Sequence, residues 1–283
     1  MNEVKLDRRP AATDAGRRED CRALAIVGAG PNGTYALERL TAILLTRPPE
    51  VPLRIVFFEK SGCWGSGDIY RPTQARTNRM NRFVDRLGFG ADESCTDIGE
   101  LLEKRHRRDL YQWCQKKFAE TNDPAFDVQL NEYPPRYIHG LALEEAFQRF
   151  EALIRDIDGV VVERVSGEVV DCMEDGEGYT LVVLANGEEQ IRKGFDEVLF
   201  ATGHQTMQEA VRADRIGSSS DGAGDHFIPY AFPLETNLSL DAVAPGCRLA
   251  MVGLGLTAID ILLYVTEGRG GTFHRNPETG QLD

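Results

Sequence analysis

The 283-residue sequence lacks several features that mark large classes of proteins. No window approaches about 18 consecutive apolar residues, the length that a membrane-spanning helix needs. Positive charge is also scarce, because 32 Lys and Arg face 45 Asp and Glu and leave a net charge of -13. Such a chain repels phosphate backbones and anionic lipid. We therefore expect neither nucleic acid nor a membrane as a partner.

Six cysteines are present, but no CxxC pair and no Cys or His cluster at the spacing of metal ligands. We interpret the cysteines as reduced thiols of a cytoplasmic protein and expect no metal site. The first residues are polar and charged and lack the apolar stretch of a signal peptide. Residues 1–21 are therefore predicted to be a disordered leader.

The most informative stretch is "AIVGAGPNGTYALERL", residues 25–40. Its apolar start predicts a buried parallel strand over 24–27, and the apolar positions beyond Pro31 recur at helical spacing until "RPPE" at 47–50. A second buried strand, "RIVFFEK", is predicted at 54–60. The pattern is a strand, a glycine turn, a helix and a strand.

The glycines of this turn follow the pattern GxGxxG at Gly28, Gly30 and Gly33, with Pro31 between them. The first glycine permits a tight turn, the second allows a pyrophosphate to approach the backbone, and the third permits close packing of helix and strand. Glu59 closes the second strand, where a carboxylate accepts hydrogen bonds from ribose hydroxyls. The pattern predicts a dinucleotide site; the competing interpretation is a glycine turn that serves packing alone.

Further along, helices are predicted near 98–120 and over 140–157, and a third parallel strand from 159. The segment that follows alternates, with turns at "EDGEG" and "ANGEE", and indicates an antiparallel meander. "FDEVLFATG" at 195–203 is expected to return to a buried strand. Residues 205–227 have the composition of a mobile surface loop. Residues 247–275 then repeat the opening arrangement of strand, GxGxxA turn, helix and strand.

Together these motifs resemble the flavoprotein class with two dinucleotide-binding domains, which includes flavin monooxygenases and the glutathione reductase group. The stretch "EKSGCWGSGDIYRPTQARTNRMNRF" resembles more closely the bacterial FAD/NAD(P)-binding protein family. This resemblance implies an α/β fold: a Rossmann-like FAD-binding domain with a β-meander, and a partial second Rossmann-like NAD(P)-binding domain. The implied bounds are 22–204 for the FAD domain, 205–245 for a linker and loops, and 246–283 for the partial domain.

The resemblance also assigns cofactor-binding residues in the first domain. The FAD pyrophosphate would lie at the first glycine turn, the adenosine ribose at Glu59 beside Lys60, and Val169 near the adenine. Four residues would lie towards the flavin ring or, in the alternative, belong to a loop packed by its own side chains. These four are Gly65, Gly67, Asn78 and Met80. Thr202 and Gly203 would form a turn that passes near the cofactor.

The second turn contains Gly253, Gly255 and Thr257 and would bind the nicotinamide cofactor. Its following strand ends without an acidic residue, and Arg275 stands where a 2′-phosphate needs a cation. We therefore expect NADPH rather than NADH. The alternative is that Arg275 is a solvated surface residue.

The implied function is that of an FAD-dependent, NAD(P)H-using oxidoreductase. No cysteine pair suits a disulfide reductase, which leaves a monooxygenase or a simpler oxidoreductase. The resemblance to flavin monooxygenases, including those that oxygenate amine nitrogens, implies a monooxygenase acting on a small amine or amino acid as the leading hypothesis, with no catalytic residue assigned. The second glycine turn has only half of a nucleotide-binding domain around it, as in a chain truncated at its C-terminus. A non-catalytic FAD- or nucleotide-binding subunit, a fragment of a larger flavoenzyme, a homo-oligomer and a chain completed by a partner remain alternatives.

Overall fold

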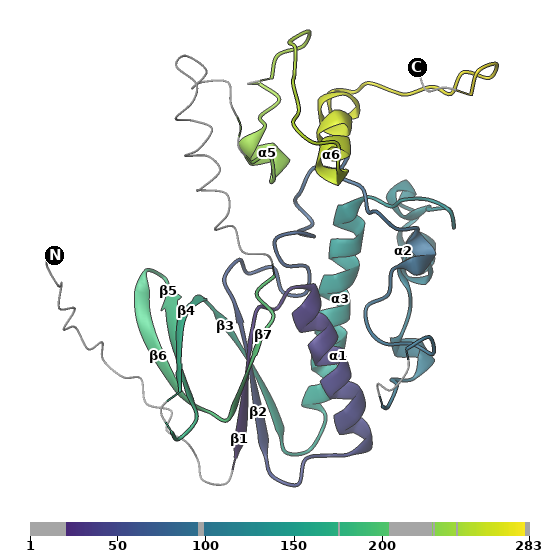
Figure 1. Ribbon diagram of the computed structural model, residues 1–283. Coiled ribbons are helices and arrows are strands. Elements are labelled where there is room, and N and C mark those ends of the chain that lie inside the picture. Colours follow the sequence, from purple (N-terminus) through teal and green to yellow (C-terminus); the bar gives the residue numbers. More distant parts are fainter. Residues whose placement is uncertain are drawn as a thin grey trace, which may run out of the picture. The chain divides into compact units, whose positions relative to one another are not determined.

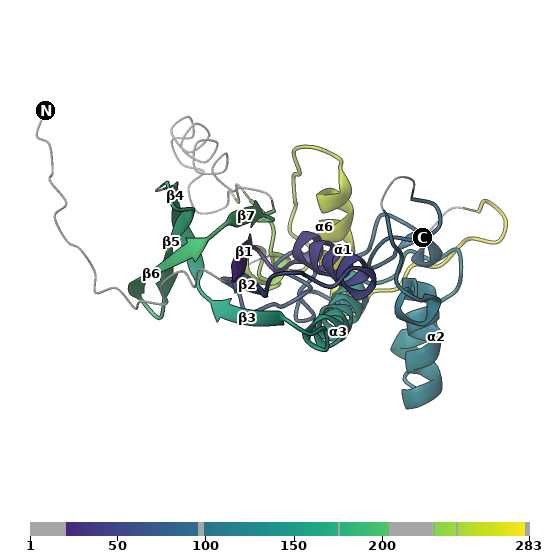
Figure 2. The ribbon, with the colours of Figure 1, turned by 90° about the horizontal axis from the view of Figure 1, so that it is seen from below.

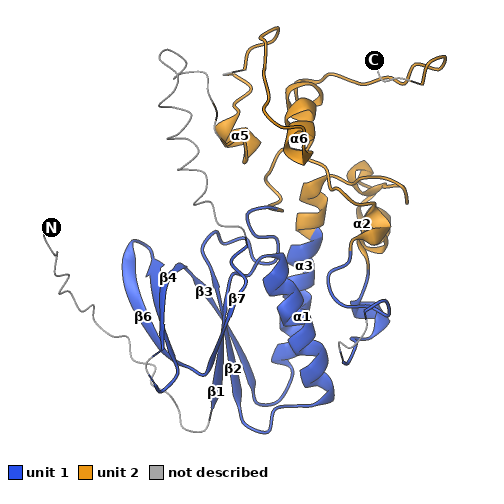
Figure 3. Cartoon of the chain, in the orientation of Figure 1, with its two compact units in different colours: residues 1–69, 88–108, 142–203 blue, residues 70–87, 109–141, 204–283 orange. Residues whose placement is uncertain are grey.

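The computed structural model describes residues 21–95, 99–174, 176–203, 228, 230–241 and 243–280. The chain divides into two compact units, which Figure 3 distinguishes by colour. Unit 1 comprises residues 1–69, 88–108 and 142–203, and unit 2 comprises residues 70–87, 109–141 and 204–283. The predicted leader, apart from Cys21, and the predicted loop at 205–227 lie outside the described residues.

Unit 1 is built on a four-stranded parallel sheet in the order β3-β2-β1-β7. These strands are β1 (Arg22–Val27), β2 (Leu53–Glu59), β3 (Val160–Ser166) and β7 (Glu197–Phe200). All neighbouring pairs are parallel, and Val27 at the end of β1 lies opposite Phe58 on one side and Phe200 on the other. The three strands predicted near 24–27, at 54–60 and from 159 are confirmed.

Helices cover one face of this sheet and a second, antiparallel sheet covers the other (Figures 1 and 2). The helices are α1 (Pro31–Thr46) and the part of α3 (Arg136–Arg155) that belongs to unit 1. The antiparallel sheet, in the order β4-β5-β6, contains β4 (Glu168–Glu174), β5 (Tyr179–Ala185) and β6 (Glu188–Phe195). This sheet is the predicted meander, and α1 ends where "RPPE" begins.

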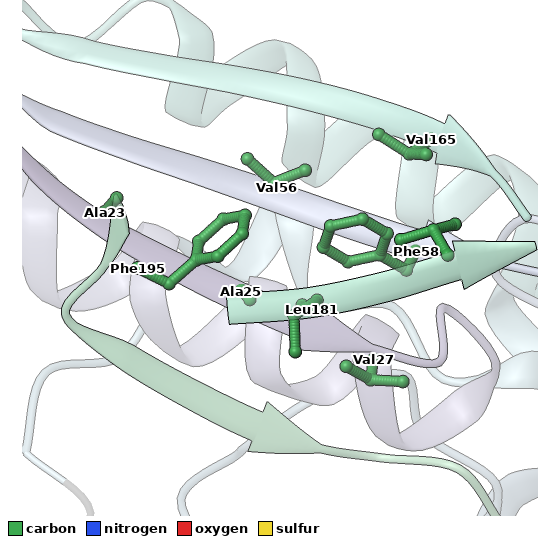
Figure 4. Close-up of a cluster of buried hydrophobic side chains, with 9 residues drawn as sticks. Ala23, Ala25, Val27, Val56, Phe58, Val165, Leu181 and Phe195 are labelled. Carbon is green, nitrogen blue, oxygen red and sulfur yellow. The ribbon is translucent and has the colours of Figure 1, made fainter. Parts of the chain in front are cut away.

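Each strand of the parallel sheet sends alternate side chains to its two faces. Phe58 packs edge-on against Phe195 of the meander, with ring centroids 5.9 Å apart, and Figure 4 shows both within one buried cluster. The next side chain, Phe57, points the opposite way and meets Phe147 of α3 at 5.2 Å. The continuous apolar run of β2 therefore reflects a strand buried on both faces.

The prediction of a buried strand at 195–203 was partly wrong. The strand β7 forms and its glycine turn follows, but Leu199 and Phe200 are 42% and 57% exposed. The physical reason is position: β7 is at the edge of the sheet, with β1 as its partner. An apolar run indicates a strand, but it does not distinguish an edge strand from a central one.

The named secondary-structure elements in the described part of unit 2 are helices joined by irregular segments. Its helices are η1 (Val84–Arg86), α2 (Leu110–Thr121), η3 (Pro124–Phe126), the first residues of α3, α5 (Leu234–Asn237), α6 (Leu256–Val265) and η5 (Glu267–Arg269). A further short helix, η2 (Lys104–His106), belongs to unit 1. In the described ranges, no helix combines the length and apolar character needed to cross a membrane.

Two predicted helix bounds need correction. The helix predicted from 98 begins only at Leu110, because Asp109 forms a capping box with Gln112: its carboxylate accepts from the Gln112 N–H at 2.7 Å, and the Gln112 side chain accepts from the Asp109 N–H. The helix predicted from 140 begins at Arg136, directly after Pro134 and Pro135. Each helix begins at a local signal, a capping residue in one case and a pair of prolines in the other. The pattern of apolar residues does not contain these signals.

The strands predicted on either side of the second glycine turn were also wrong. The helix α6 follows the turn as predicted, but within residues 243–280, which the structure describes throughout, the chain forms no strand before or after it. Val252 is fully exposed and Leu254 is 91% exposed. A parallel strand requires a neighbour for its backbone hydrogen bonds, and an apolar segment without one stays irregular.

Candidate functional site

The carboxyl ends of the four parallel strands meet at one edge of the sheet in unit 1. The first glycine turn leaves β1 at this edge, Glu59 ends β2, and Thr202 follows β7. The chain places β2 and β3 on one side of β1 and then returns β7 to its other side. Such a reversal of strand order is the place where open α/β sheets bind ligands.

Two glycines of the first turn are required by the packing of the turn itself. Gly28 has φ +101°, and a Cβ atom there would lie 2.3 Å from the Ala201 carbonyl oxygen. A Cβ atom at Gly33 would lie 2.4 Å from the Gly28 carbonyl oxygen. Only glycine fits such contacts. The absence of a Cβ atom at Gly28 lets the end of β1 lie against the residue after β7, and its absence at Gly33 lets α1 lie against the turn.

Gly30 has a different environment. It caps α1 with an extended conformation, and a Cβ atom there would lie 3.4 Å from the Gly67 Cα atom, an ordinary contact distance. Pro31 occupies the first helical position, so the N–H groups of Asn32 and Gly33 precede the first intrahelical bond, from the Thr34 N–H to the Gly30 carbonyl. These groups form the end of a helix that attracts anions.

The loop that contains Gly65 and Gly67 lies directly against this turn. The Gly65 N–H donates to the Ala29 carbonyl at 2.7 Å, and the Thr34 hydroxyl donates to the Gly65 carbonyl at 3.2 Å. Gly67 has φ +57° and lies against Gly30. The structure therefore brings these two predicted residues to the glycine turn.

Glu59 is 7% exposed, and its carboxylate holds two segments of the site together. Oε2 accepts from the Ala29 N–H at 2.9 Å, and Oε1 accepts from the Ser61 N–H at 3.0 Å and the Ser61 hydroxyl at 2.7 Å. A carboxylate has about four lone-pair positions. One position therefore remains for a hydroxyl donor such as a ribose.

The other predicted residues of unit 1 lie at or near the same edge. Lys60 pairs with Glu168 at 3.1 Å, between two exposed side chains. Val169 follows Glu168 in β4 and packs against the buried cluster that the parallel sheet and the meander share. Thr202 is exposed beside Gly203, whose φ is +74°.

Asn78 and Met80 belong to unit 2, where both side chains are buried. The Asn78 amide nitrogen donates to the Gln74 side-chain oxygen at 3.0 Å. Its Oδ1 atom is buried with no hydrogen-bond partner among the described residues. A buried acceptor in this state costs free energy unless a donor reaches it. The amide is thus suited to receive an N–H or O–H group of a ligand.

The second glycine turn, also in unit 2, is open. Gly253 has φ +93°, and the described part of the chain places no heavy atom within 4 Å of a Cβ atom there or at Gly255. Thr257 is the second residue of α6. Arg275 is exposed, and its guanidinium donates to the Gly280 carbonyl at 2.9 Å.

Sequence reasoning missed several residues that organise these segments. In unit 1 these are Ala29 and Ser61, which bind Glu59, and the Ser66 hydroxyl, which donates to Glu144 at 2.9 Å. Burial raises the pKa of Glu144, and the hydrogen bond from Ser66 offsets part of this rise. In unit 2 they are Arg136 and Asp260, 2.8 Å apart. A single carboxylate within the apolar helix "LTAIDILLYV" was the available signal, because a buried charge requires a partner.

The residues of unit 1 fit a dinucleotide. A tight glycine turn, a helix start with free N–H groups and a carboxylate at the end of the neighbouring strand are the parts that hold a pyrophosphate and a ribose. The fold and this edge define an α/β protein of the dinucleotide-binding class. The chain belongs to the FAD-NAD(P)-binding family, whose sequence model matches residues 25–205.

Curated relatives extend over nearly all of the chain. It is 29% identical over 255 residues to nitrosuccinic acid synthase npaA from Aspergillus oryzae, a match that covers 90% of this chain and 37% of the relative. It is 30% identical over 273 residues to the L-aspartate N-monooxygenase (nitrosuccinate-forming) from Streptomyces cremeus, covering 90% and 39%. The chain therefore spans about two fifths of the length of these relatives.

Among solved structures, the chain is similar to the lysine monooxygenase NbtG from Nocardia farcinica. The sequences are 15% identical, and the match covers 65% of this chain and 45% of the other, with a TM-score of 0.43. A TM-score this low carries no argument about fold or function. The family assignment depends on the sequence match instead.

Proposed function

We propose that this chain is part of an FAD-dependent, NAD(P)H-using N-monooxygenase that acts on a small amino acid. The observation that supports the proposal is the glycine turn of unit 1 together with Glu59, whose arrangement fits a dinucleotide. The substrate class comes from the relatives: two proteins that match 90% of this chain are named for nitrosuccinate formation, one of them from L-aspartate. Aspartate is therefore the first substrate to test.

In this proposal each segment has a distinct role. The N–H groups of Asn32 and Gly33 bind the FAD pyrophosphate, and Glu59 accepts a ribose hydroxyl. In unit 2, Asn78 offers its buried acceptor to a bound ligand. Bound flavin would supply the redox chemistry, taking electrons from the nicotinamide and passing them to dioxygen, so that one oxygen atom goes to the amine nitrogen and the other leaves as water.

We further propose that the second turn, from Gly253 to Thr257, binds the nicotinamide cofactor and that the cofactor is NADPH. The helix α6 offers its N-terminal N–H groups to a pyrophosphate, and Arg275 supplies a cation for the 2′-phosphate. In this proposal residues 22–204 form the domain that contacts FAD, and residues 246–283 form the partial domain that contacts the nicotinamide cofactor.

A second candidate function is nucleotide binding without catalysis. The observation that favours it is the second turn, which has no flanking strand within the described residues 243–280. A chain of this kind would bind FAD through unit 1 and serve as a subunit of a larger assembly. It would not exchange electrons with NADPH by itself.

Absorption spectroscopy separates these candidates. The purified chain is mixed with FAD, and unbound FAD is removed by gel filtration. The absorption bands of flavin are then expected to show a near-stoichiometric amount of bound FAD. Anaerobic NADPH is expected to bleach these bands, and aspartate in air is expected to increase NADPH oxidation with formation of an N-oxygenated product. Flavin without bleaching would favour the second candidate. Absence of bound flavin would contradict both.

A further inference from the structure

Asp260 makes an unusual set of contacts for a residue of an apolar helix. It is 5% exposed, and both of its carboxylate oxygens bind groups from other segments of unit 2. Oδ1 accepts from the backbone N–H of Arg79 at 3.2 Å, and Oδ2 accepts from the guanidinium of Arg136 at 2.8 Å. The helix that follows the second glycine turn is therefore attached to the segment that contains Asn78 and Met80.

Hydrogen bonds satisfy the N–H and the carbonyl of both peptides that flank Arg79. The Asn78 carbonyl accepts from the Arg136 N–H at 2.8 Å, and the Arg79 N–H of the same peptide donates to Asp260. In the next peptide, the Arg79 carbonyl accepts from the Arg136 guanidinium at 2.9 Å, and the Met80 N–H donates to the Pro134 carbonyl at 2.9 Å. Two consecutive peptide planes are thus fixed at both ends.

Asn78 and Met80 lie at the outer ends of these two planes, so the hydrogen bonds fix the positions of their Cα atoms. Both side chains are buried. Asp260 is three residues after Thr257, one turn into α6. One carboxylate therefore connects the second glycine turn to the segment that carries the buried acceptor of Asn78.

We propose that Asp260 is a positioning residue that couples nicotinamide binding at the second glycine turn to the orientation of the Asn78–Met80 segment. The inference depends on the proposed nicotinamide site. When a nucleotide occupies the turn and restrains the start of α6, Asp260 and Arg136 restrain the two peptides around Arg79. Asn78 is then held in one orientation whenever the nucleotide is bound. Asp260 contacts neither cofactor in this proposal.

Hydrogen exchange measured by mass spectrometry tests this coupling, with NADPH as the probe. In the wild-type protein, NADPH is expected to slow exchange at 253–258 and also at 78–80. In Asp260→Asn, one neutral acceptor oxygen replaces the two charged oxygens that serve the Arg79 N–H and the Arg136 guanidinium, and the charge pair is lost. Without NADPH, the Arg79 amide of this variant should exchange roughly tenfold faster, the effect of one hydrogen bond to a charged group. With NADPH, 253–258 should still be protected, but 78–80 should not.

The matched control is Glu267→Gln, which removes the same charge from the short helix after α6. Glu267 lies 3.9 Å from the Arg79 guanidinium, and the hydrogen bonds recorded for the peptides around Arg79 go to other residues. This variant should behave as the wild type in both segments. If Asp260→Asn does not fold, the double variant Asp260→Leu/Arg136→Met replaces the pair, since apolar replacement of a buried pair is often tolerated. It should show the same loss of coupling.

The outcomes separate this inference from the proposed function. Equal NADPH protection at 78–80 in the wild type and the Asp260 variant would overturn the coupling and leave the nicotinamide site intact. If NADPH protects 253–258 but not 78–80 in the wild type, the coupling is likewise overturned and the nicotinamide site is left intact. Absence of protection at 253–258 in the wild type would refute the nicotinamide site, and the coupling with it.

Discussion

The two glycine turns have similar sequences but are held by different means. In the first turn, Gly28 and Gly33 lie so close to neighbouring backbone that no Cβ atom fits, and strands flank the turn on both sides. In the second turn, the described residues leave open space around Gly253 and Gly255. The turn is attached to the rest of unit 2 through a side-chain pair, Asp260 and Arg136.

This difference determines how a mutation in each turn can be interpreted. At Gly28 or Gly33 a substitution disturbs backbone packing before any ligand is considered, so a loss of binding there says little about the ligand. At Gly255 neither the described packing nor the backbone conformation opposes a Cβ atom, so a loss of binding reports on the ligand, whereas at Gly253 the positive φ adds backbone strain. Gly30 lies in the first turn but has the tolerant geometry of the second, and it is the informative position of unit 1.

The largest expected effect is on folding. Gly28→Ala places a Cβ atom 2.3 Å from a carbonyl oxygen at a positive φ, and overpacking together with strain should cost about 3 kcal/mol or more. Gly253→Ala has the strain without the clash and should cost about 1 kcal/mol. Urea unfolding followed by circular dichroism measures both. Equal losses in the two variants would contradict the comparison.

A second test uses pH, because unit 2 contains a buried histidine. Burial lowers the pKa of His139 from 6.5 to about 4, so the folded state keeps this ring neutral while the unfolded state takes up a proton below pH 6.5. The stability linked to His139 is therefore complete above pH 6.5 and is lost as the pH falls towards 4. The loss should approach about 3 kcal/mol.

Urea unfolding at intervals between pH 7 and pH 4 measures this loss. His139→Gln should reduce the slope over this range, whereas His274→Gln, at an exposed position, should leave it unchanged. Hydrogen exchange at pH 5 should show the earlier opening in residues 109–141 of unit 2. An unchanged slope in the His139 variant would show that this histidine does not make unit 2 sensitive to acid.

The third test concerns binding without unfolding. Gly30→Ala adds a Cβ atom at 3.4 Å from Gly67, which the fold tolerates, but the methyl group occupies the approach of a pyrophosphate. FAD affinity should fall at least a hundredfold, or about 2.7 kcal/mol, while the urea midpoint stays near that of the wild type. Gly255→Ala is the matched control and should leave FAD binding intact. A Gly30 variant that retains stoichiometric flavin would show that the first motif is misinterpreted.

The sequence predicted the first turn well because its information is local. The order of apolar strand, glycines, Pro31 and apolar helix positions lies within about twenty residues, and the meander shows its alternation within each strand. Glu59 was predicted from its place at the end of a strand. The hydrogen bonds from Ala29 and Ser61 to Glu59 depend on how the chain turns at the carboxyl ends of the strands. No rule of residue spacing predicts that turn.

The second turn was predicted less well because its surroundings depend on distant segments. The apolar residues before Gly253 satisfy the pattern of a strand, yet a strand forms only where another strand can pair with it, and the pattern does not show whether one is there. The pair of Asp260 and Arg136 joins residues 124 positions apart. A carboxylate within an apolar helix indicates that Asp260 needs a partner, but which residue supplies it depends on tertiary packing that the sequence pattern does not contain.

The smallest expected effect concerns the choice between NADPH and NADH at the second turn. Arg275→Ala removes the cation proposed for the 2′-phosphate, and the only hydrogen bond that the described residues record for its guanidinium is the one to Gly280. Because Arg275 is exposed, we expect a loss at the low end for a charged contact: about tenfold in NADPH affinity, or about 1.5 kcal/mol, with NADH unchanged. Isothermal titration with each nucleotide measures this, and Arg86→Ala, at an exposed arginine, is the control. Equal weakening of both nucleotides would mean that Arg275 supports the turn rather than reading the phosphate. No weakening of either would assign Arg275 to the solvated surface and leave the NADPH preference without a residue to explain it.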